Sequence, residues 1–435
     1  MAVVHVVGGG LAGLAAAVKV VADGGRAVVY EMAPNCGGRC RSLDDPSTGL
    51  TIDNGNHLML SGNHELVAYL AMIGGAEHLR GSRRAAFPLV DLATGARGAL
   101  DLGIGRWPWP LLRRTGRPPG VRLRDLVRLG RIFARRPGET VAERVGPGCP
   151  LMRSVWEPLT AAILNETPDH GDADLLAATL RETVLKGAPA CRPLVPAAGL
   201  SDTFIDPALD FLAARGSIVR TGISVTGLET DAGPAAMGDA QSAGPIRALR
   251  IGKARDRVAI DPQDSVVLAV PAGRAADLLP GLRHPPPGET IVNLHFRRDQ
   301  PNTTAEEPIL IGLLGGTAQW LFPRPTIWSV TISAAGEVAD RDASSLAEAV
   351  WSEIVPVLGN EGRRASIPRF RVIKERRATV RQRPDDQALR PPARTPWPNL
   401  WLAGDWTDTG IPATMEGAVR SGFRAGLAAL GATSG

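Results

Sequence analysis

An α/β fold is predicted by three features of the first forty residues. The apolar run 3–7 has the length and composition of a buried β-strand, and the alanine-rich segment 14–22 has those of a helix. Between them lies the glycine turn 8–13, and a second apolar run, 27–30, leads to Glu31. Strand, glycine turn, helix, strand and acid follow one another in the order of a Rossmann-type nucleotide-binding unit.

The spacing of the glycines has a physical explanation. Gly8 permits a tight turn out of the strand, Gly10 lets a pyrophosphate approach the backbone, and Gly13 lets the helix pack close to the sheet. The N–H groups and the positive end of the helix dipole then face the phosphates. Glu31 can accept hydrogen bonds from both hydroxyls of an adenosine ribose. A glycine turn without a ligand is the alternative, and the strand, helix and acid in their expected places disfavour it.

Length and composition limit the class of protein. A chain of 435 residues is too long for one ordinary core, so two interleaved domains are expected. Hydrophobic residues make up 44% and charged residues 21%, which is typical of a globular protein. No apolar run reaches about 18 residues, and the first strand begins almost at once, so we expect neither a membrane span nor a secretory signal and a cytoplasmic location. The four cysteines form no CxxC pair, which indicates neither a metal site nor a disulfide framework.

The remaining apolar patterns indicate how the chain divides. Helical spacing recurs between 150 and 215, a buried strand at 265–271 is expected to rejoin the first sheet, and strand-like runs lie between 291 and 333. A mixed sheet with helices is therefore expected beside the nucleotide-binding part. The expected boundaries are 1–75, 200–285 and 390–435 for the nucleotide-binding domain, and 76–199 and 286–389 for the substrate domain, with a helical part at 104–190.

Three further segments bring polar groups toward the predicted phosphate site. Gly38 and Arg39 lie in a loop whose glycines let a guanidinium reach an anion. The loop 53–57, Asp-Asn-Gly-Asn-His, is polar backbone in an apolar region, typical of a cofactor or active-site lining. A single histidine there is more often structural than catalytic. The strand 400–405 ends in Gly-Asp, and a second helix opens at 413–419.

Residues 106–136 differ in composition from the rest of the chain. They contain tryptophans 107 and 109, a single acid, Asp125, and arginines 106, 113, 114, 117, 122, 124, 128, 131, 135 and 136. Basic and aromatic residues together indicate a surface that rests on anionic lipid, on the inner membrane for a cytoplasmic protein. A solvated helical cap is an equally good interpretation. No nucleic-acid-binding motif is present, so nucleic acid is not an expected partner.

The nucleotide unit, the Gly-Gly-Arg loop and the terminal block from Ala403 to Ala418 resemble the FAD-dependent amine oxidase and phytoene desaturase superfamily. The segments 53–57, 156–165, 196–201, 319–322 and 412–416 are similar to those of its squalene-associated branch, the bacterial hydroxysqualene dehydroxylases of hopanoid synthesis. This resemblance implies an amine oxidase-like fold with FAD as cofactor.

The resemblance also implies an activity, the reductive dehydroxylation of hydroxysqualene to squalene by hydride transfer from reduced flavin. It implies a long apolar isoprenoid substrate and its handover from a squalene-synthase-like enzyme. A carotenoid-type desaturase, an amine oxidase and a flavin-binding protein without turnover are the alternatives. Amine oxidases often hold a lysine near the flavin, but 309–333 contains none, and Lys374 is the only nearby candidate.

The resemblance implies roles for individual residues. His57 is the expected proton donor, and Asp53 is the second choice. Leu58, Trp320 and Phe322 are expected in apolar or cation-facing walls. The implied FAD contacts are Gly8, Gly10, Leu11, Ala12, Gly13, Glu31, Gly38, Arg39, Gly55, Asn56, Val225, Gly404, Asp405, Met415 and Ala418.

Overall fold

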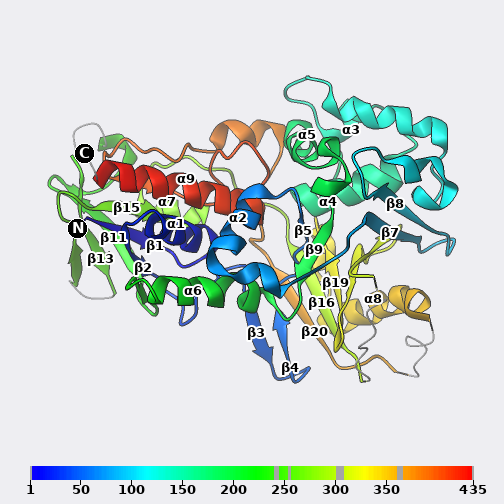
Figure 1. Ribbon diagram of the computed structural model, residues 1–435, viewed down its shortest axis with the longest axis horizontal. Coiled ribbons are helices and arrows are strands. Elements are labelled where there is room, and N and C mark those ends of the chain that lie inside the picture. Colours follow the sequence, from blue (N-terminus) through cyan, green and yellow to red (C-terminus); the bar gives the residue numbers. More distant parts are fainter. Residues whose placement is uncertain (1, 240–243, 253–255, 300–307, 360–365, 434–435) are drawn as a thin grey trace.

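Two large β-sheets with helices on their faces form the computed structural model, which describes residues 2–239, 244–252, 256–299, 308–359 and 366–433 (Figure 1). The predicted α/β fold is confirmed. No helix in these described ranges is long and apolar enough to cross a membrane.

The first sheet is parallel and assembles strands from distant parts of the chain. Its order is β10 (Ile218–Arg220), β2 (Arg26–Tyr30), β1 (Val3–Val7), β15 (Ser265–Leu268) and β21 (Leu400–Leu402). The prediction that a strand near 265–271 rejoins the first sheet is confirmed, because β15 pairs with β1 in parallel. β21 then pairs with the other side of β15, which brings the end of the chain beside its beginning.

Two helices pack against each other on this sheet. α1 (Leu11–Ala22) begins three residues earlier than its apolar pattern indicated, and α9 (Met415–Thr433) runs beside it (Figure 1). A side chain at Gly422 would place its Cβ 2.2 Å from the carbonyl oxygen of Ala12, so only glycine permits this approach. The alanines of α1 are buried by the contact.

The second sheet is mixed and has seven strands. Its order is β20 (Phe370–Glu375), β16 (Ile291–Arg297), β19 (Ile327–Ile332), β18 (Trp320–Pro323), β17 (Ile311–Leu314), β7 (Ala85–Asp91) and β8 (Arg97–Gly103). Helix α8 (Ala343–Leu358) packs with the side chains of one face into a hydrophobic core. Because side chains alternate along a strand, the other face of β16 and β19 carries the residues in between.

Smaller elements connect and cover the two sheets. The remaining strands are β3 (Ser42–Asp45), β4 (Leu50–Asp53), β5 (Met59–Leu60), β6 (Leu79–Gly81), β9 (Pro193–Pro196), β11 (Val225–Thr230), β12 (Gly233–Pro234), β13 (Ile246–Ile251) and β14 (Arg257–Ala259). The remaining α-helices are α2 (His64–Ile73), α3 (Val141–Val145), α4 (Glu157–Leu164), α5 (Ala173–Glu182), α6 (Asp206–Ala213) and α7 (Ala272–Leu278).

The arginine-rich segment is less regular than a helical cap. It folds into 3₁₀ turns, η2 (Trp109–Leu112), η3 (Arg114–Gly116) and η4 (Leu123–Phe133), ahead of α3. Prolines and glycines interrupt the sequence from 108 to 120, and proline cannot continue an α-helix.

The α1–α9 contact predicts opposite effects for two glycines of one helix. Gly422→Ala should lower the free energy of unfolding by about 2 kcal/mol, because the new methyl group clashes with backbone. Gly431→Ala, with no atom near its Cβ position, should raise it by up to about 1 kcal/mol. Urea unfolding of both variants measures the difference. A Gly422→Ala protein as stable as the parent would contradict the described packing.

Candidate active site

The glycine turn and Glu31 lie together at the carboxyl edge of the parallel sheet, where such sheets bind ligands. Oε2 of Glu31 accepts a hydrogen bond from the N–H of Gly9 at 2.7 Å, and Oε1 accepts one from Ala33 at 2.8 Å. The acid at the end of β2 is therefore bound directly to the glycine turn that follows β1.

The turn combines tight packing with an open side. A Cβ at Gly13 would lie 1.9 Å from the carbonyl oxygen of Gly8, and Gly8 itself has φ +109°. At Gly10, in contrast, no atom lies within 4 Å of the Cβ position. No side chain caps α1, and its first turn contains no acid. The arrangement presents free N–H groups of a helix N-terminus to an open space, which suits an anion.

Two arginines hold the loop between β21 and α9. Nη2 of Arg39 donates to Oδ1 of Asp405 at 2.7 Å, and this carboxylate raises the pKa of the guanidinium. Arg390 is buried and donates to the carbonyls of residues 405, 407 and 411 and to the hydroxyl of Thr409. Sequence reasoning missed Arg390, because no motif distinguishes it from the other arginines of the chain.

The first turn of α9 lies beside the start of α2. Both carboxylate oxygens of Glu416 accept hydrogen bonds from the N–H groups of Glu65 and Leu66. Met415 and Ala418, which precede and follow this acid, are only partly buried. The second helix N-terminus predicted from the sequence is therefore fixed by a side chain that caps a neighbouring helix.

The loop 53–57 faces the polar strip of the second sheet, which consists of Asn293 and His295 on β16 and of Ser329 and Thr331 on β19. Nδ2 of Asn56 donates to the hydroxyl of Thr331, which donates to Oδ1 of Asn293. A Cβ at Gly55 would lie 3.2 Å from the amide nitrogen of Asn293. Oδ1 of Asn56 is buried without a hydrogen-bond partner in the described structure, so it remains available to a ligand.

Asp53 contacts three other chain segments. Its carboxylate accepts from the hydroxyl of Ser42 and the N–H of Leu200 and lies 2.7 Å from Nη1 of Arg324. The ion pair links β4, which pairs with β3 in a two-stranded sheet, to the turn after β18 in the second sheet. Asp53 thus holds the side chain of Arg324 in place.

His57 differs from Asp53 in having no hydrogen bond to any described residue. Burial lowers the pKa of its imidazole to about 4, and the charges of Arg39 and Arg324 add to this, although Asp53 opposes it. The ring is consequently neutral at physiological pH, with both nitrogens available to a ligand.

A second histidine lies nearby on the polar strip of the sheet. Nδ1 of His295 bonds the hydroxyl of Ser329, and its Nε2 is buried without a partner in the described structure. Burial lowers the pKa of His295 to about 4, and Arg324 contributes. Sequence reasoning missed His295, although polar residues at alternate positions 293 and 295 of an apolar strand were a detectable signal.

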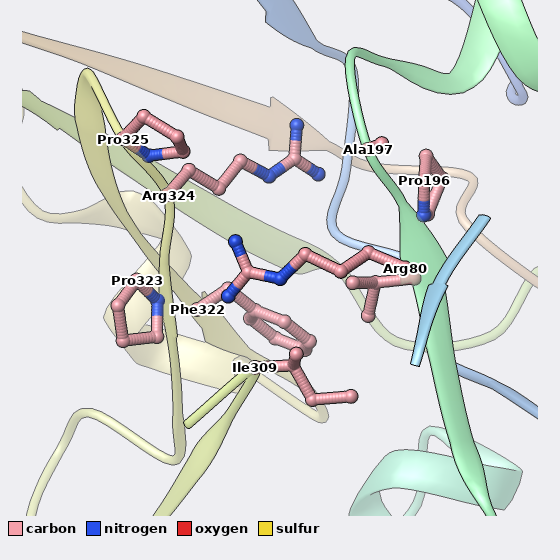
Figure 2. A pocket seen from close by; sticks show the side chains of 9 residues that line it. Arg80, Pro196, Ala197, Ile309, Phe322, Pro323, Arg324 and Pro325 are labelled. Atoms are coloured by element: carbon pink, nitrogen blue, oxygen red, sulfur yellow. The ribbon is translucent and has the colours of Figure 1, made fainter. Parts of the chain in front are cut away.

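Apolar side chains form the wall beside this polar strip. Leu58, Trp320 and Phe322 meet in one cluster with Val195 and Leu310, so the structure brings together the three wall residues chosen from the sequence. A pocket opens beside this wall, and Figure 2 shows Arg80 and Arg324 extending into it from opposite sides. Among the residues that the structure describes, no acid lines this pocket.

Val225, another predicted site residue, lies outside the two large sheets, because it starts β11 of a separate four-stranded sheet. Its carbonyl accepts a hydrogen bond from Arg274. Two residues earlier, the N–H of Ile223 bonds the carbonyl of Glu31, which keeps Val225 near the acid end of β2.

Residues 11–426 match the family model of the flavin containing amine oxidoreductases. The chain belongs to this class of oxidoreductases, and its cofactor is a flavin. Within the class, it is 42% identical to the hydroxysqualene dehydroxylase of Rhodopseudomonas palustris over 97% of both chains, and 42% identical to that of Sinorhizobium fredii over 99% of both. The chain is therefore a member of the hydroxysqualene dehydroxylase family.

More distant similarities are weaker or concern the fold alone. A phytoene desaturase of an Oncidium hybrid is 31% identical, but over only 31% of this chain and 26% of that protein. The crystal structure of an oxidoreductase from Methanosarcina mazei superposes with a TM-score of 0.69 at 14% identity, covering 97% of this chain and 99% of the other.

The buried histidines predict a pH dependence of stability. Below pH 6.5 the unfolded chain protonates these rings, whereas the folded protein does not until about pH 4, so the free energy of unfolding should fall across this window. Each histidine contributes about 3 kcal/mol to the fall. His295→Gln should flatten the pH dependence measured by urea unfolding.

The exposed His170 supplies the matched control, because His170→Gln should leave the slope between pH 6.5 and 4 unchanged. An unaltered slope in His295→Gln would show that folding does not lower the pKa of this ring.

Proposed function

We propose that this protein is an FAD-dependent hydroxysqualene dehydroxylase that replaces the hydroxyl of hydroxysqualene by hydrogen to give squalene. The observation that carries the proposal is the 42% identity to proteins of that name over nearly the whole length of both chains. The phytoene desaturases match only one part of the chain, so they give less support to a desaturase reaction.

FAD is proposed as the particular flavin because the first sheet fits both halves of a dinucleotide. The open space above Gly10 and the uncapped start of α1 suit a pyrophosphate. Glu31 keeps lone pairs for ribose hydroxyls after accepting its two backbone hydrogen bonds. We propose that Gly8, Gly10, Leu11, Ala12, Gly13 and Glu31 hold the nucleotide, with Gly38, Arg39, Gly404 and Asp405 at the pyrophosphate, Val225 at the adenine, and Gly55, Asn56, Met415 and Ala418 at the flavin ring.

The reaction replaces a C–O bond by a C–H bond and releases water, so it consumes one hydride and one proton, and the proton is taken up from solvent. Bound in its reduced form, the flavin supplies the hydride. We propose that a ring nitrogen of His57 hydrogen-bonds the departing hydroxyl, since this imidazole has no bond to any described residue. Asp53 positions Arg324 and the loop that carries His57.

The neutral state of His57 also suits a carbon that becomes positively charged when its hydroxyl departs. A protonated imidazole would repel that charge, whereas burial keeps the ring neutral. The indole of Trp320 and the ring of Phe322, in the neighbouring wall, can stabilise a cation through their π-faces. The long apolar chain of the substrate then packs on the same wall.

An amine oxidase reaction receives less support from the same residues. The side chain of Lys374 donates to the carbonyl of Arg341, and Lys374 pairs with Val292, whose side chain belongs to the α8 core on the opposite face from His295. Among the described residues, the charged groups that line the pocket of Figure 2 are Arg80 and Arg324, and neither is an acid that could pair with a cationic amine.

Turnover under anaerobic conditions tests the proposed reaction. The flavin of the purified protein is reduced, hydroxysqualene is added in detergent micelles, and flavin absorbance and products are followed. We expect the flavin to be reoxidised with formation of one squalene per flavin. Absence of reoxidation, with bleaching of the oxidised protein by a polyene precursor or an amine, would overturn the proposal in favour of a desaturase or an oxidase.

The variant His57→Gln separates the chemical step from binding in the same assay. We expect reoxidation to slow at least tenfold while flavin content stays at the level of the parent protein. Reoxidation as fast as in the parent would show that His57 takes no part in the reaction. Flavin binding without any substrate-dependent change in absorbance would instead support a flavin-binding protein without turnover.

Glu31 gives a separate prediction for the identity of the cofactor. Glu31→Gln should weaken FAD binding by about tenfold to a hundredfold, because charge-assisted hydrogen bonds are lost. FMN, which lacks the adenosine, should bind both proteins equally weakly. Fluorescence titration of the deflavinated protein with FAD and FMN measures both constants.

The exposed Glu77 provides the control, and Glu77→Gln should bind FAD like the parent protein. Equal loss of FAD and FMN affinity in Glu31→Gln would indicate a general effect on the fold and not a ribose contact.

A further inference from the structure

Exposed large hydrophobic side chains are concentrated at one end of the molecule. Among the described residues they are Met32, Val67, Ile104, Trp107, Trp109, Leu112, Leu123, Val127, Val184, Leu185, Ile218 and Leu427. Eight of these twelve lie in residues 104–127 and 184–185. In Figure 1 this region is the cyan end, opposite the two termini.

These eight residues form one surface because their supporting segments share a core. Leu111 of η2 and the partly buried Leu126 of η4 pack in the same cluster as Ala188 and Cys191. The N–H of Ala188 bonds the carbonyl of Gly105, which joins η6 (Val184–Lys186) to the start of the arginine-rich segment. The exposed side chains of η2, η4 and η6 are therefore carried by segments that pack against one another.

The two tryptophans set this surface apart from the rest of the protein. The chain has nine tryptophans, and the other seven are buried. Trp107 and Trp109 are each 68% exposed. An indole combines a large apolar body with one N–H group, the combination that is enriched where a protein meets the interface of a membrane.

Positive charge accompanies the exposed apolar groups. Arg106, Arg113, Arg114 and Arg124 are exposed and make no ion pair among the described residues. Asp125, the single acid between 106 and 136, accepts a hydrogen bond from the N–H of Arg122. A predominantly positive surface with interspersed apolar groups is complementary to anionic headgroups above an acyl layer.

We propose that residues 104–128 with 184–186 form a surface that binds an anionic lipid bilayer. The indoles and aliphatic side chains enter the interfacial layer, and the unpaired guanidinium groups contact lipid phosphates. The surface follows from its own residues and does not depend on the proposed reaction. That reaction adds a reason for it, since a C₃₀ isoprenoid alcohol dissolves in the bilayer and not in water.

A short connection leads from this surface to the candidate active site. The hydroxyl of Ser61 donates to the carbonyl of Pro189, and a Cβ at Gly62 would lie 2.6 Å from the carbonyl oxygen of Ala190. The segment 187–190 thus packs between the surface and the loop that continues from His57. A bilayer bound here lies on the side of the substrate-facing elements.

Vesicle binding of the holoprotein tests the proposal. We expect flotation with phosphatidylcholine vesicles containing 30% phosphatidylglycerol and little flotation with phosphatidylcholine alone. Arg113→Glu/Arg114→Glu and Trp107→Ala/Trp109→Ala should each weaken partitioning at least tenfold, and added salt should weaken the parent's binding. Brominated lipids should quench tryptophan emission in the parent and not in the tryptophan variant, because the other seven indoles are buried.

Matched substitutions outside the surface are the controls. Arg26→Glu/Arg283→Glu makes the same charge change at exposed residues that form no ion pair with any described residue, and Leu427→Ser removes an exposed apolar group of α9. Both should bind vesicles like the parent. Equal flotation with neutral and anionic vesicles, or equal binding by the two arginine double variants, would overturn the proposal. So would surface variants that bind vesicles normally but dissociate an oligomer, since the surface would then be a protein contact.

Turnover in detergent micelles keeps this proposal separate from the proposed reaction. A protein that binds anionic vesicles without dehydroxylating hydroxysqualene would retain the surface and lose the reaction. A protein that turns over in micelles and ignores vesicles would do the opposite.

Discussion

The close approach of Gly13 to Gly8 is the constraint on which the rest of the structure depends. A Cβ at Gly13 would lie 1.9 Å from the carbonyl oxygen of Gly8, so α1 can start directly above the end of β1 only without that side chain. This fixes the helix N-terminus at the carboxyl edge of the sheet. The buried face of α1 then receives α9, again through a glycine, Gly422. One close contact therefore positions both helix N-termini that face the cofactor region.

Besides the glycines, arginine side chains hold the loops of this region in place. Arg390 donates hydrogen bonds to carbonyls of the loop after β21. Carbonyl groups of a buried loop need such partners. Arg39 and Arg324 each pair with a carboxylate from a different chain segment, Asp405 and Asp53. A buried ion pair adds little net stability compared with apolar packing, but loss of one partner leaves the other charge uncompensated. Such pairs therefore make one relative placement of the loops much more favourable than any other.

The extent to which the sequence predicted the structure follows from the range of each interaction. The first strand, the glycine turn, α1 and Glu31 depend on local spacing, and they were predicted. The return of β15 to the first sheet was also predicted, because a continuous apolar run indicates a strand buried on both faces. The partners of Arg324 and Arg390 could not be predicted, since one sequence does not show which of its many arginines meets which distant loop.

The segment 106–136 illustrates a different limit. Its composition indicated the chemistry of a surface but not its conformation, because arginine and leucine are good helix formers and prolines and glycines override them. The 3₁₀ turns found there leave Trp107 and Trp109 exposed. His57 and His295 show the same limit within the site. A histidine in a loop or on a strand is compatible with many roles until the burial around it is known.

That burial determines the charge that the candidate active site can hold. Desolvation lowers the pKa of both histidines, and Arg324 lowers both further, whereas Asp53 compensates only in part. Near neutral pH the rings are uncharged, and the charges of Arg324 and Asp53 offset each other. Among the described residues of the site, the neutral buried atoms without a hydrogen-bond partner include Oδ1 of Asn56, Nε2 of His295 and the indole nitrogen of Trp320. The adjoining wall of Trp320 and Phe322 is apolar. A site of this kind is better suited to an uncharged ligand with one polar group on a long apolar body than to a cation with a permanent charge, since the carboxylate of Asp53 already pairs with Arg324.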